Sequence, residues 1–430
     1  MLSACATDPC LDNGVADPAL HGFHDALHAL ERGEVRQVRV LHLGDSHIAG
    51  DSFSGALQSL MAARFGDAGR GQMPPGSPFR YYRRQGFSFE MSDGWTIFSV
   101  KTGPQVGPFG LSGHRAESAS ANDWMSLEVE NRAALKIVRL QVLAQPGGGS
   151  VSVELNGTAA GVYSTSGPVP ELFEITLEGI SVRQVRVRPA GDGPIALLGW
   201  GGETDSPGIS YEAQGFSGAT LNVLEGFDPS LVAAEIAARP PHLIVLGFGT
   251  NEGFDDALNP ALYRQMMRER VEWLRAQAPG ASLLVIGAFD GARLPQWARV
   301  GTRAEASSVG DVPRSALPCE PLALHERATY AALTAARDPR LARWHAPLNL
   351  SAVRDVQKTV SMAQGLSYWD GEAAMGGACG IHKMTFEEPP LAYGDHVHLT
   401  PAGAQNLAEK LWAHLMAGFG PGQCGAGRPR

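Results

Sequence analysis

The chain has 430 residues, of which 44% are hydrophobic, and carries a formal net charge of -9 at pH 7. This charge provides no electrostatic attraction to nucleic acid, so we expect no nucleic-acid partner. The length and composition predict a globular protein of two or three domains. No apolar run approaches the roughly 20 residues that span a bilayer, so we expect no membrane-spanning segment.

Residues 1–17 are expected to form a tail before the first helix. Within this tail, Leu2-Ser3-Ala4-Cys5 matches the cleavage box of bacterial lipoproteins, but the basic and apolar leader that normally precedes such a box is not part of this sequence. Either the leader lies outside the sequence or the match is chance. A lipid anchor at Cys5 therefore remains one alternative.

The first structured part of the chain is predicted to begin with a helix, a strand and a second helix. Apolar spacing and an apolar run place these elements at residues 18–32, 35–43 and 54–65. A Gly-Asp-Ser-His sequence follows the strand, so Ser46 is expected at a strand-to-helix turn. The glycines and prolines between residues 66 and 76 predict a loop.

Between residues 86 and 198, apolar residues alternate with a period of two, which is typical of strands. Asn156-Gly157 is a strong hairpin turn. Short strands are predicted at residues 124–129, 135–143, 151–155, 172–177 and 182–187. We therefore predict a β-sandwich over residues 86–198, inserted as a separate module that shapes or extends the substrate cleft.

After residue 199 the chain alternates again between apolar strands and helices, which predicts a parallel sheet covered on both faces. Strands are predicted at residues 242–248 and 282–289, and a strand or loop at 366–369. Helices are predicted at 231–238, 261–277, 320–336 and 400–417, the last one capped by Thr400 with Pro401 at its first position. The fold class is therefore α/β, formed by residues 18–85 and 199–418, with a flexible tail over residues 419–430.

Four stretches carry side chains that suit the hydrolysis of an ester by a serine. This chemistry needs a nucleophile, a base, an acid that orients the base, and hydrogen-bond donors for the oxyanion. The stretches are Gly44-Asp45-Ser46, Gly215-Phe216-Ser217-Gly218-Ala219, Gly249-Thr250-Asn251-Glu252 and Asp395-His396-Val397-His398. An imidazole can take the proton of a serine hydroxyl and return it to the leaving alcohol, because its pKa lies near neutrality.

In this order the four stretches resemble the sequence blocks of the SGNH, or GDSL-type, hydrolases. The resemblance implies a three-layer, flavodoxin-like SGNH hydrolase domain. It assigns the nucleophile to Ser46, the base to His398 and the orienting acid to Asp395. The oxyanion donors would be the backbone N–H groups of Ser46 and Gly218, preferred over Gly215, and the side-chain amide of Asn251. The implied mechanism uses no metal and no cofactor.

Further features narrow the resemblance to the bacterial peptidoglycan O-acetylesterases, which carry a carbohydrate-binding-like sandwich inserted into the SGNH fold. These features are the predicted insertion, Gly249-Thr250-Asn251-Glu252 and Ala374-Met375-Gly376-Gly377. The resemblance implies removal of the acetyl group from the muramyl O-6 position in the periplasm. The sequence departs from the family in two places: His47 stands where the general signature has leucine, and Glu252 where the block commonly has aspartate. Neither change removes a catalytic group.

Several other residues are given structural roles. We expect Asp45 to bond to backbone N–H groups of its turn and Glu252 to fix a loop. His47 and His396 are either solvated neighbours of the site, which we favour, or contacts to the substrate. Trp95, Trp124 and Trp200 are expected in the core of the sandwich rather than at sugar-stacking surfaces. Cys319 and Cys379 could form a disulfide, which a location in the cell envelope would allow.

Four alternatives remain. The first is a dinuclear metallophosphoesterase, whose ligands would be Asp45, His47, Asn251, His396 and His398, although parts of that family's pattern are missing. In the second, a sugar hydroxyl resolves the acetyl-enzyme, which makes the protein an O-acetyltransferase. The third is an acetylesterase for another polysaccharide such as xylan. The fourth is a carbohydrate-binding protein with an inactive site.

Overall fold

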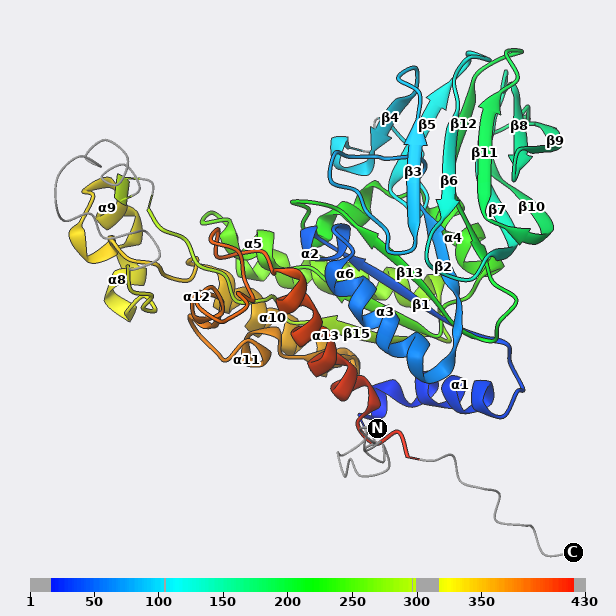
Figure 1. Ribbon diagram of the computed structural model, residues 1–430. Coiled ribbons are helices and arrows are strands. Elements are labelled where there is room, and N and C mark those ends of the chain that lie inside the picture. The colour runs from blue at the N-terminus through cyan, green and yellow to red at the C-terminus, as the bar shows by residue number, and fades with distance from the viewer. Residues whose placement is uncertain (1–16, 104–105, 296, 299–316, 421–430) are drawn as a thin grey trace, which may run out of the picture.

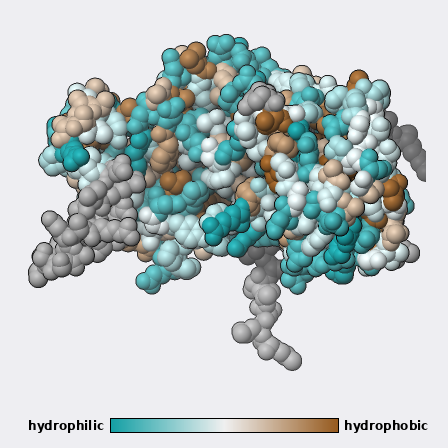
Figure 2. Space-filling view, turned by 90° about the horizontal axis from the view of Figure 1, so that it is seen from above, coloured by the Kyte–Doolittle hydropathy of each residue, from teal (hydrophilic) through white to brown (hydrophobic). Residues whose placement is uncertain are grey.

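The computed structural model describes residues 17–103, 106–295, 297–298 and 317–420. Most of the two predicted tails, Cys5 included, lies outside these residues. A large sheet with helices on both faces forms one half of the molecule, and a second sheet stacks against its other end (Figure 1). In the part of the chain that is described, no helix is long and apolar enough to cross a membrane. Seen from above, hydrophobic residues form small separate patches among hydrophilic ones (Figure 2).

Five parallel strands form one end of the large sheet. Their order is β13 (Gly208–Gly215), β1 (Gln37–Gly44), β14 (Leu243–Gly247), β15 (Ser282–Ile286) and β16 (Ser367–Trp369). The strands are buried along most of their length, as expected of a parallel sheet that is covered on both faces. The carboxyl ends of β1, β13 and β14 consequently meet at one edge, where ligand sites of such sheets lie.

Two hydrophobic cores hold helices on the two faces of this sheet. One face carries α1 (His21–Glu31), α3 (Ser52–Phe65) and α13 (Pro401–Met416). The other carries α4 (Pro229–Ala238), α6 (Pro260–Gln277) and α10 (Leu350–Gln364). These helices lie within a few residues of the bounds predicted for them where the sequence predicted one, and α10 was not predicted. The helix predicted over residues 320–336 is instead two short helices, α8 (Leu324–Ala328) and α9 (Tyr330–Ala335).

The loop predicted between residues 66 and 76 is wrong in its first part, which forms strand β2 (Asp67–Met73). This strand pairs in parallel with β13 and antiparallel with β12 (Ile195–Glu203). The glycines that suggested a loop allow the backbones of β2 and β12 to approach each other closely. A Cβ atom on Gly69, which has a φ of +130°, would lie 2.6 Å from the carbonyl oxygen of Gly202.

The predicted insertion contains two sheets that face each other across one hydrophobic core. The first consists of β12, β7 (Leu135–Ala144), β10 (Glu171–Val182), β5 (His114–Ser118) and β4 (Thr96–Ser99). The second has the order β3 (Phe87–Met91), β6 (Met125–Val129), β11 (Gln184–Pro189), β8 (Ser150–Leu155) and β9 (Thr158–Ser164). Trp95 and Trp200 are buried in the core between them, whereas Trp124 is half-buried with the guanidinium group of Arg186 over its ring.

The predicted insertion shares a sheet with the parallel strands. Strand β12 pairs with β7 on one side and with β2 on the other, so one continuous sheet runs from the sandwich into the parallel strands. The boundary predicted between residues 198 and 199 falls inside β12. The sheet has no break at residues 198–199. The domain boundaries at residues 85–86 and 198–199 remain predictions.

A disulfide bond joins Cys319 to Cys379, the pair that the sequence left open. Cys319 precedes the small lobe of α8 and α9 at the left of Figure 1, and Cys379 directly precedes α12 (Gly380–Met384), which follows α11 (Gly371–Ala374). The bond closes a loop of 60 residues, which restricts the unfolded chain and so stabilises the fold.

Candidate active site

The site is built on the turn after β1, where the chain enters the short helix α2 (Ser46–Ala49). Asp45 caps this helix: its Oδ1 atom accepts a hydrogen bond of 3.0 Å from the backbone N–H of His47. A Cβ atom at Gly44 would lie 2.3 Å from the Ile48 side chain, so glycine is needed for the tight turn. This geometry agrees with a structural role for Asp45 and leaves the half-buried Ser46 at the edge of the sheet.

His398 reaches Ser46 from the loop that precedes α13. Its Nε2 atom lies 3.0 Å from Ser46 Oγ, and its Nδ1 atom lies 2.7 Å from Asp395 Oδ2. Because an ionised carboxylate only accepts hydrogen bonds, Nδ1–H donates to Asp395, and Nε2 is left to accept the hydroxyl proton of Ser46. The three side chains predicted to work together therefore form one hydrogen-bonded chain, although Ser46 and His398 are 352 residues apart.

Asp395 is held in its ionised form by its own loop. Burial raises the pKa of this carboxyl group, but hydrogen bonds from the His398 ring and from the backbone N–H groups of His398 and Val397 lower it by more, to about 2. The carboxylate is consequently charged at any pH above this value. It can fix the orientation of the imidazole and stabilise its positive charge.

The predicted oxyanion donors lie in the turns after the two strands that flank β1. Gly218, with a φ of +72°, follows β13, and Asn251 lies in α5 (Thr250–Phe254) after β14. One hydrogen of the Asn251 amide is donated to the carbonyl oxygen of Ala219 over 2.7 Å, which fixes the amide beside the Gly218 turn. Gly215 lies at the end of β13, where an added Cβ atom would be 2.1 Å from the backbone nitrogen of Ala49. Its requirement for glycine is therefore explained by packing against α2.

A lysine from the predicted insertion also reaches the site, and no motif in the sequence marks it. Lys101, in the 3₁₀ turn η2 (Val100–Thr102), donates a hydrogen bond to the carbonyl oxygen of Ser217. This carbonyl and the Gly218 N–H belong to the same peptide group, so the ammonium charge polarises that N–H as a donor. Lys101 and Gly218 line a cavity of about 450 Å³. A different cavity, of about 650 Å³, lies against the residues between α2 and α3 and the start of α3.

His47 and His396 are not solvated, which corrects the expectation for both. Their exposed fractions are 8% and 2%. The ring of His396 stacks on Trp344 with centroids 3.7 Å apart, and its Nε2 atom lies 2.9 Å from Nδ1 of His382. The backbone of His396 is left-handed, with a φ of 59°, and periodicity in the sequence gives no sign of this conformation.

Glu252 fixes the oxyanion loop, as predicted from its place in the motif. Its Oε1 atom accepts a hydrogen bond of 2.8 Å from the backbone N–H of Leu221, three residues after Gly218. Burial raises the pKa of this carboxyl group, while hydrogen bonds from backbone N–H groups, that of Leu221 first, partly oppose the increase; the resulting pKa is about 7.

Glu252→Gln is expected to stabilise the protein at alkaline pH. The pKa of about 7 in the folded protein exceeds the value of roughly 4.3 in unfolded chains, so the contribution of the Glu252 carboxyl group to stability is greatest below about pH 4.3. It then falls by up to about 1.4 kcal/mol per pH unit until the pH passes 7. Glutamine keeps an acceptor for Leu221 without a charge. Calorimetric melting temperatures should therefore be similar at pH 5 and higher for the variant at pH 8; an equal difference at both values contradicts the assignment.

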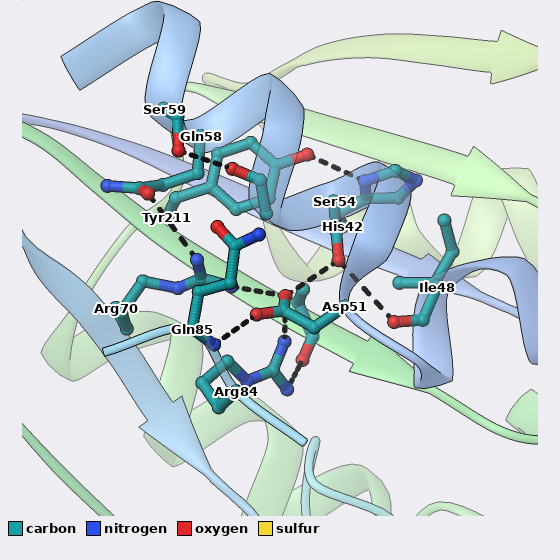
Figure 3. A network of polar contacts seen from close by, with 12 residues as sticks. His42, Ile48, Asp51, Ser54, Gln58, Ser59, Arg70, Arg84, Gln85 and Tyr211 are labelled. Carbon is teal, nitrogen blue, oxygen red and sulfur yellow. Dashed lines mark hydrogen bonds and ion pairs between the residues drawn. The ribbon is translucent and has the colours of Figure 1, made fainter. Parts of the chain in front are cut away.

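A network of buried charged side chains lies beside the turn that carries Ser46, here called the nucleophile turn (Figure 3). Asp51, which follows α2, accepts hydrogen bonds from the guanidinium groups of Arg70 and Arg84 and from the backbone N–H of Gln85. Arg84 also donates to the carbonyl oxygen of Ala213 in β13. The network thus connects the residues just before the predicted insertion to β2, to β13 and to the nucleophile turn.

Among the described residues, no three histidine, cysteine, aspartate or glutamate side chains are grouped so that they could hold a metal ion. The two C-terminal histidines named for a dinuclear metal site are bonded to other side chains. His398 bonds to Ser46 and Asp395, while His396 bonds to His382.

We compared the chain with known protein families, curated proteins and solved structures. No family model matches the chain, and no curated protein matches it. A solved structure of a peptidoglycan O-acetylesterase is similar, with a TM-score of 0.70 and 21% sequence identity, and covers 95% of this chain and 98% of its own. A family two carbohydrate esterase from Clostridium thermocellum, at 11% identity, covers 77% of this chain and all of its own with a TM-score of only 0.27. The chain thus shares the fold of the peptidoglycan O-acetylesterase over nearly its whole length, including the sandwich.

Proposed function

We propose that the protein is a serine esterase that removes O-acetyl groups from a polysaccharide of the bacterial cell envelope, through an acetyl-Ser46 intermediate. The observation that carries this proposal is the hydrogen-bonded chain from Asp395 through His398 to Ser46. The order of the five parallel strands supports it. Numbered along the chain, with β2 left out, they follow the flavodoxin-like order 2-1-3-4-5, which is consistent with a three-layer SGNH-type domain.

In the proposed reaction, Ser46 Oγ attacks the carbonyl carbon of the acetyl ester while its proton passes to His398 Nε2. The negative charge on the former carbonyl oxygen is stabilised by the N–H groups of Ser46 and Gly218 and by the second hydrogen of the Asn251 amide. His398 then gives its proton to the sugar oxygen as the C–O bond breaks. Water, deprotonated by His398, attacks the acetyl-serine, and acetate leaves as the Ser46 hydroxyl is restored.

Peptidoglycan, acetylated at the muramyl O-6 position, is the substrate that we propose. The support is the similarity in fold to a peptidoglycan O-acetylesterase, which extends over the sandwich as well as the site. The Cys319–Cys379 disulfide fits an oxidising compartment, so we propose a location in the periplasm or cell envelope, with Cys5 as the lipid-anchor candidate.

Acetate release should be measured with O-acetylated peptidoglycan, acetylated xylan and an aryl acetate, for the wild type and for Ser46→Ala. We expect peptidoglycan to be the best polymer and all activity to depend on Ser46. Preference for xylan contradicts the proposed substrate but leaves the chemistry in place. Transfer of acetyl to added glycan in place of acetate release identifies a transferase. Activity that a chelator abolishes and Ser46→Ala retains identifies the metal mechanism.

Asn251→Ala is expected to lower kcat on the aryl acetate by roughly 10²- to 10³-fold, because one donor to the oxyanion is lost. KM should change little, since this bond strengthens only as the oxygen becomes charged. Asn222→Ala is the matched control, because Asn222 lines the cavity beside Gly218 but is not one of the proposed donors. Equal kinetics for the two variants would remove Asn251 from the mechanism.

A further inference from the structure

His47 connects the turn that carries the nucleophile to the loop that carries the base. Its Nδ1 atom lies 2.9 Å from Asp45 Oδ1, and its Nε2 atom lies 3.0 Å from the backbone carbonyl oxygen of Val397. Only 4% of its side chain is exposed. The ring packs edge-on against Phe289, with centroids 5.0 Å apart, and lies 5.6 Å from the ring of His398. It is thus enclosed by the two segments that must meet for catalysis.

Both nitrogens of His47 face atoms that accept hydrogen bonds. Asp45 Oδ1 already accepts the backbone N–H of His47, and a peptide carbonyl can never donate. A neutral imidazole has a single N–H and would leave a nitrogen lone pair directed at one of these oxygens. The geometry therefore requires the doubly protonated, positively charged ring, which donates to the Asp45 carboxylate and to the Val397 carbonyl together.

We propose that His47, as an imidazolium, is a positioning residue that fixes the Asp395–His398 loop on the nucleophile turn through its bond to the Val397 carbonyl. Val397 lies between the two proposed triad members of that loop. A shift of its carbonyl would move the His398 ring away from Ser46, and displacements of about 1 Å at a reacting group can cost on the order of 10²-fold in rate. This role rests on the proposed esterase function.

The surrounding charges are consistent with a protonated His47. Burial lowers the pKa of the ring, but the charge and hydrogen bond of Asp45, the bond to Val397 and the charge of Asp395 raise it by more, so the net shift is upward. The other titratable groups nearby are His398, on the base loop, and Glu252 of α5, which interacts with Asp45. Because the pKa is raised, the protonated ring and its two hydrogen bonds are present at acidic pH and are lost as the pH rises through the raised pKa.

Leucine is the substitution that we choose for His47, because the general SGNH signature has leucine at this position. His47→Leu fills similar space but can donate neither hydrogen bond. Using the full chain and an aryl acetate, we expect kcat to fall about 10- to 100-fold while KM stays within about twofold. His47→Gln keeps one donor for the Val397 carbonyl and should recover part of the loss. Wild-type kcat should decrease at alkaline pH, and His47→Leu should lack this decrease.

His24→Leu is the matched control. His24 is also a buried histidine bonded to a backbone carbonyl, that of Leu415 over 2.8 Å, but it joins α1 to the end of α13. Its substitution should lower the melting temperature without changing kcat. If His47→Leu likewise changes only the melting temperature, the positioning role is wrong.

The protonation state has a readout that needs no activity. In ¹⁵N spectra of the wild type at pH 7, the His47 ring should show two protonated nitrogens, one coupled through its hydrogen bond to the Val397 carbonyl. A neutral His47 ring overturns the proposal even where His47→Leu fails to fold. A wild type that shows this spectrum but no Ser46-dependent esterase activity instead refutes the proposed function on which the positioning role rests.

Discussion

Ser46→Ala is expected to lower kcat for acetate release from the aryl acetate by on the order of 10⁶-fold, because the variant has no oxygen to form the acetyl-enzyme. The remaining site keeps Asn251, Gly218 and His398, so a small rate above that of water is expected. Steady-state kinetics give the loss, and mass spectrometry of the wild type after brief exposure to substrate should show one acetyl group on Ser46. The variant should show none.

The control for this prediction is Ser52→Ala, six residues further on at the start of α3, which should keep wild-type kinetics. Melting temperatures of both variants should match that of the wild type, because Ser46 is only half-buried at the surface edge of the sheet. If Ser46→Ala retains substantial activity, the serine mechanism is refuted, whatever the substrate.

The residues of the candidate site could be found from the sequence because each lies in a short motif at the end of an element. A buried strand that stops at Gly44-Asp45-Ser46 must present its polar residues at the sheet edge, and the capping pattern at Thr400-Pro401 fixes where the loop before α13 ends. The meeting of Ser46 with His398 depends on how the loop before α13 packs over this edge, which the motifs do not encode. The role of each residue in the reaction remains a proposal.

Lys101 and His47 show what such motifs leave out. The bond from Lys101 to Ser217 joins residues 116 apart, and no local pattern encodes it. The burial of His47 depends on Phe289 and Val397, which lie on other segments. Histidine is intermediate in its tendency to be buried, so the sequence alone does not decide its exposure, and only tertiary contacts do.

The same limit applies to the fold. Periodicity identified most helices and strands of the parallel domain, since their apolar faces are long, but no element was predicted where β13 and α10 lie. It did not identify β2, whose glycines are typical of loops, and therefore missed the pairing of β2 with β12 that joins the sandwich to the parallel strands. Because the sheet is continuous, deleting residues 86–198 would cut β12 and leave its remaining residues, which pair with β2, without their partner strand β7. Point variants such as those of Lys101 are consequently the better tests of what the insertion contributes.

Asp51→Asn is expected to destabilise the protein by about 3–5 kcal/mol, because it leaves Arg70 and Arg84 buried without their counter-charge. Burial raises the pKa of Asp51, but the two guanidinium groups and the Gln85 N–H lower it by more. Its contribution is thus present above the pKa of an unfolded aspartate and is lost as the pH falls through the lower folded value. Urea unfolding at pH 7 measures the change. Asp93→Asn, at an exposed aspartate, should unfold at the wild-type midpoint. If Asp51→Asn does the same, the charges of the network do not hold the nucleophile turn in place.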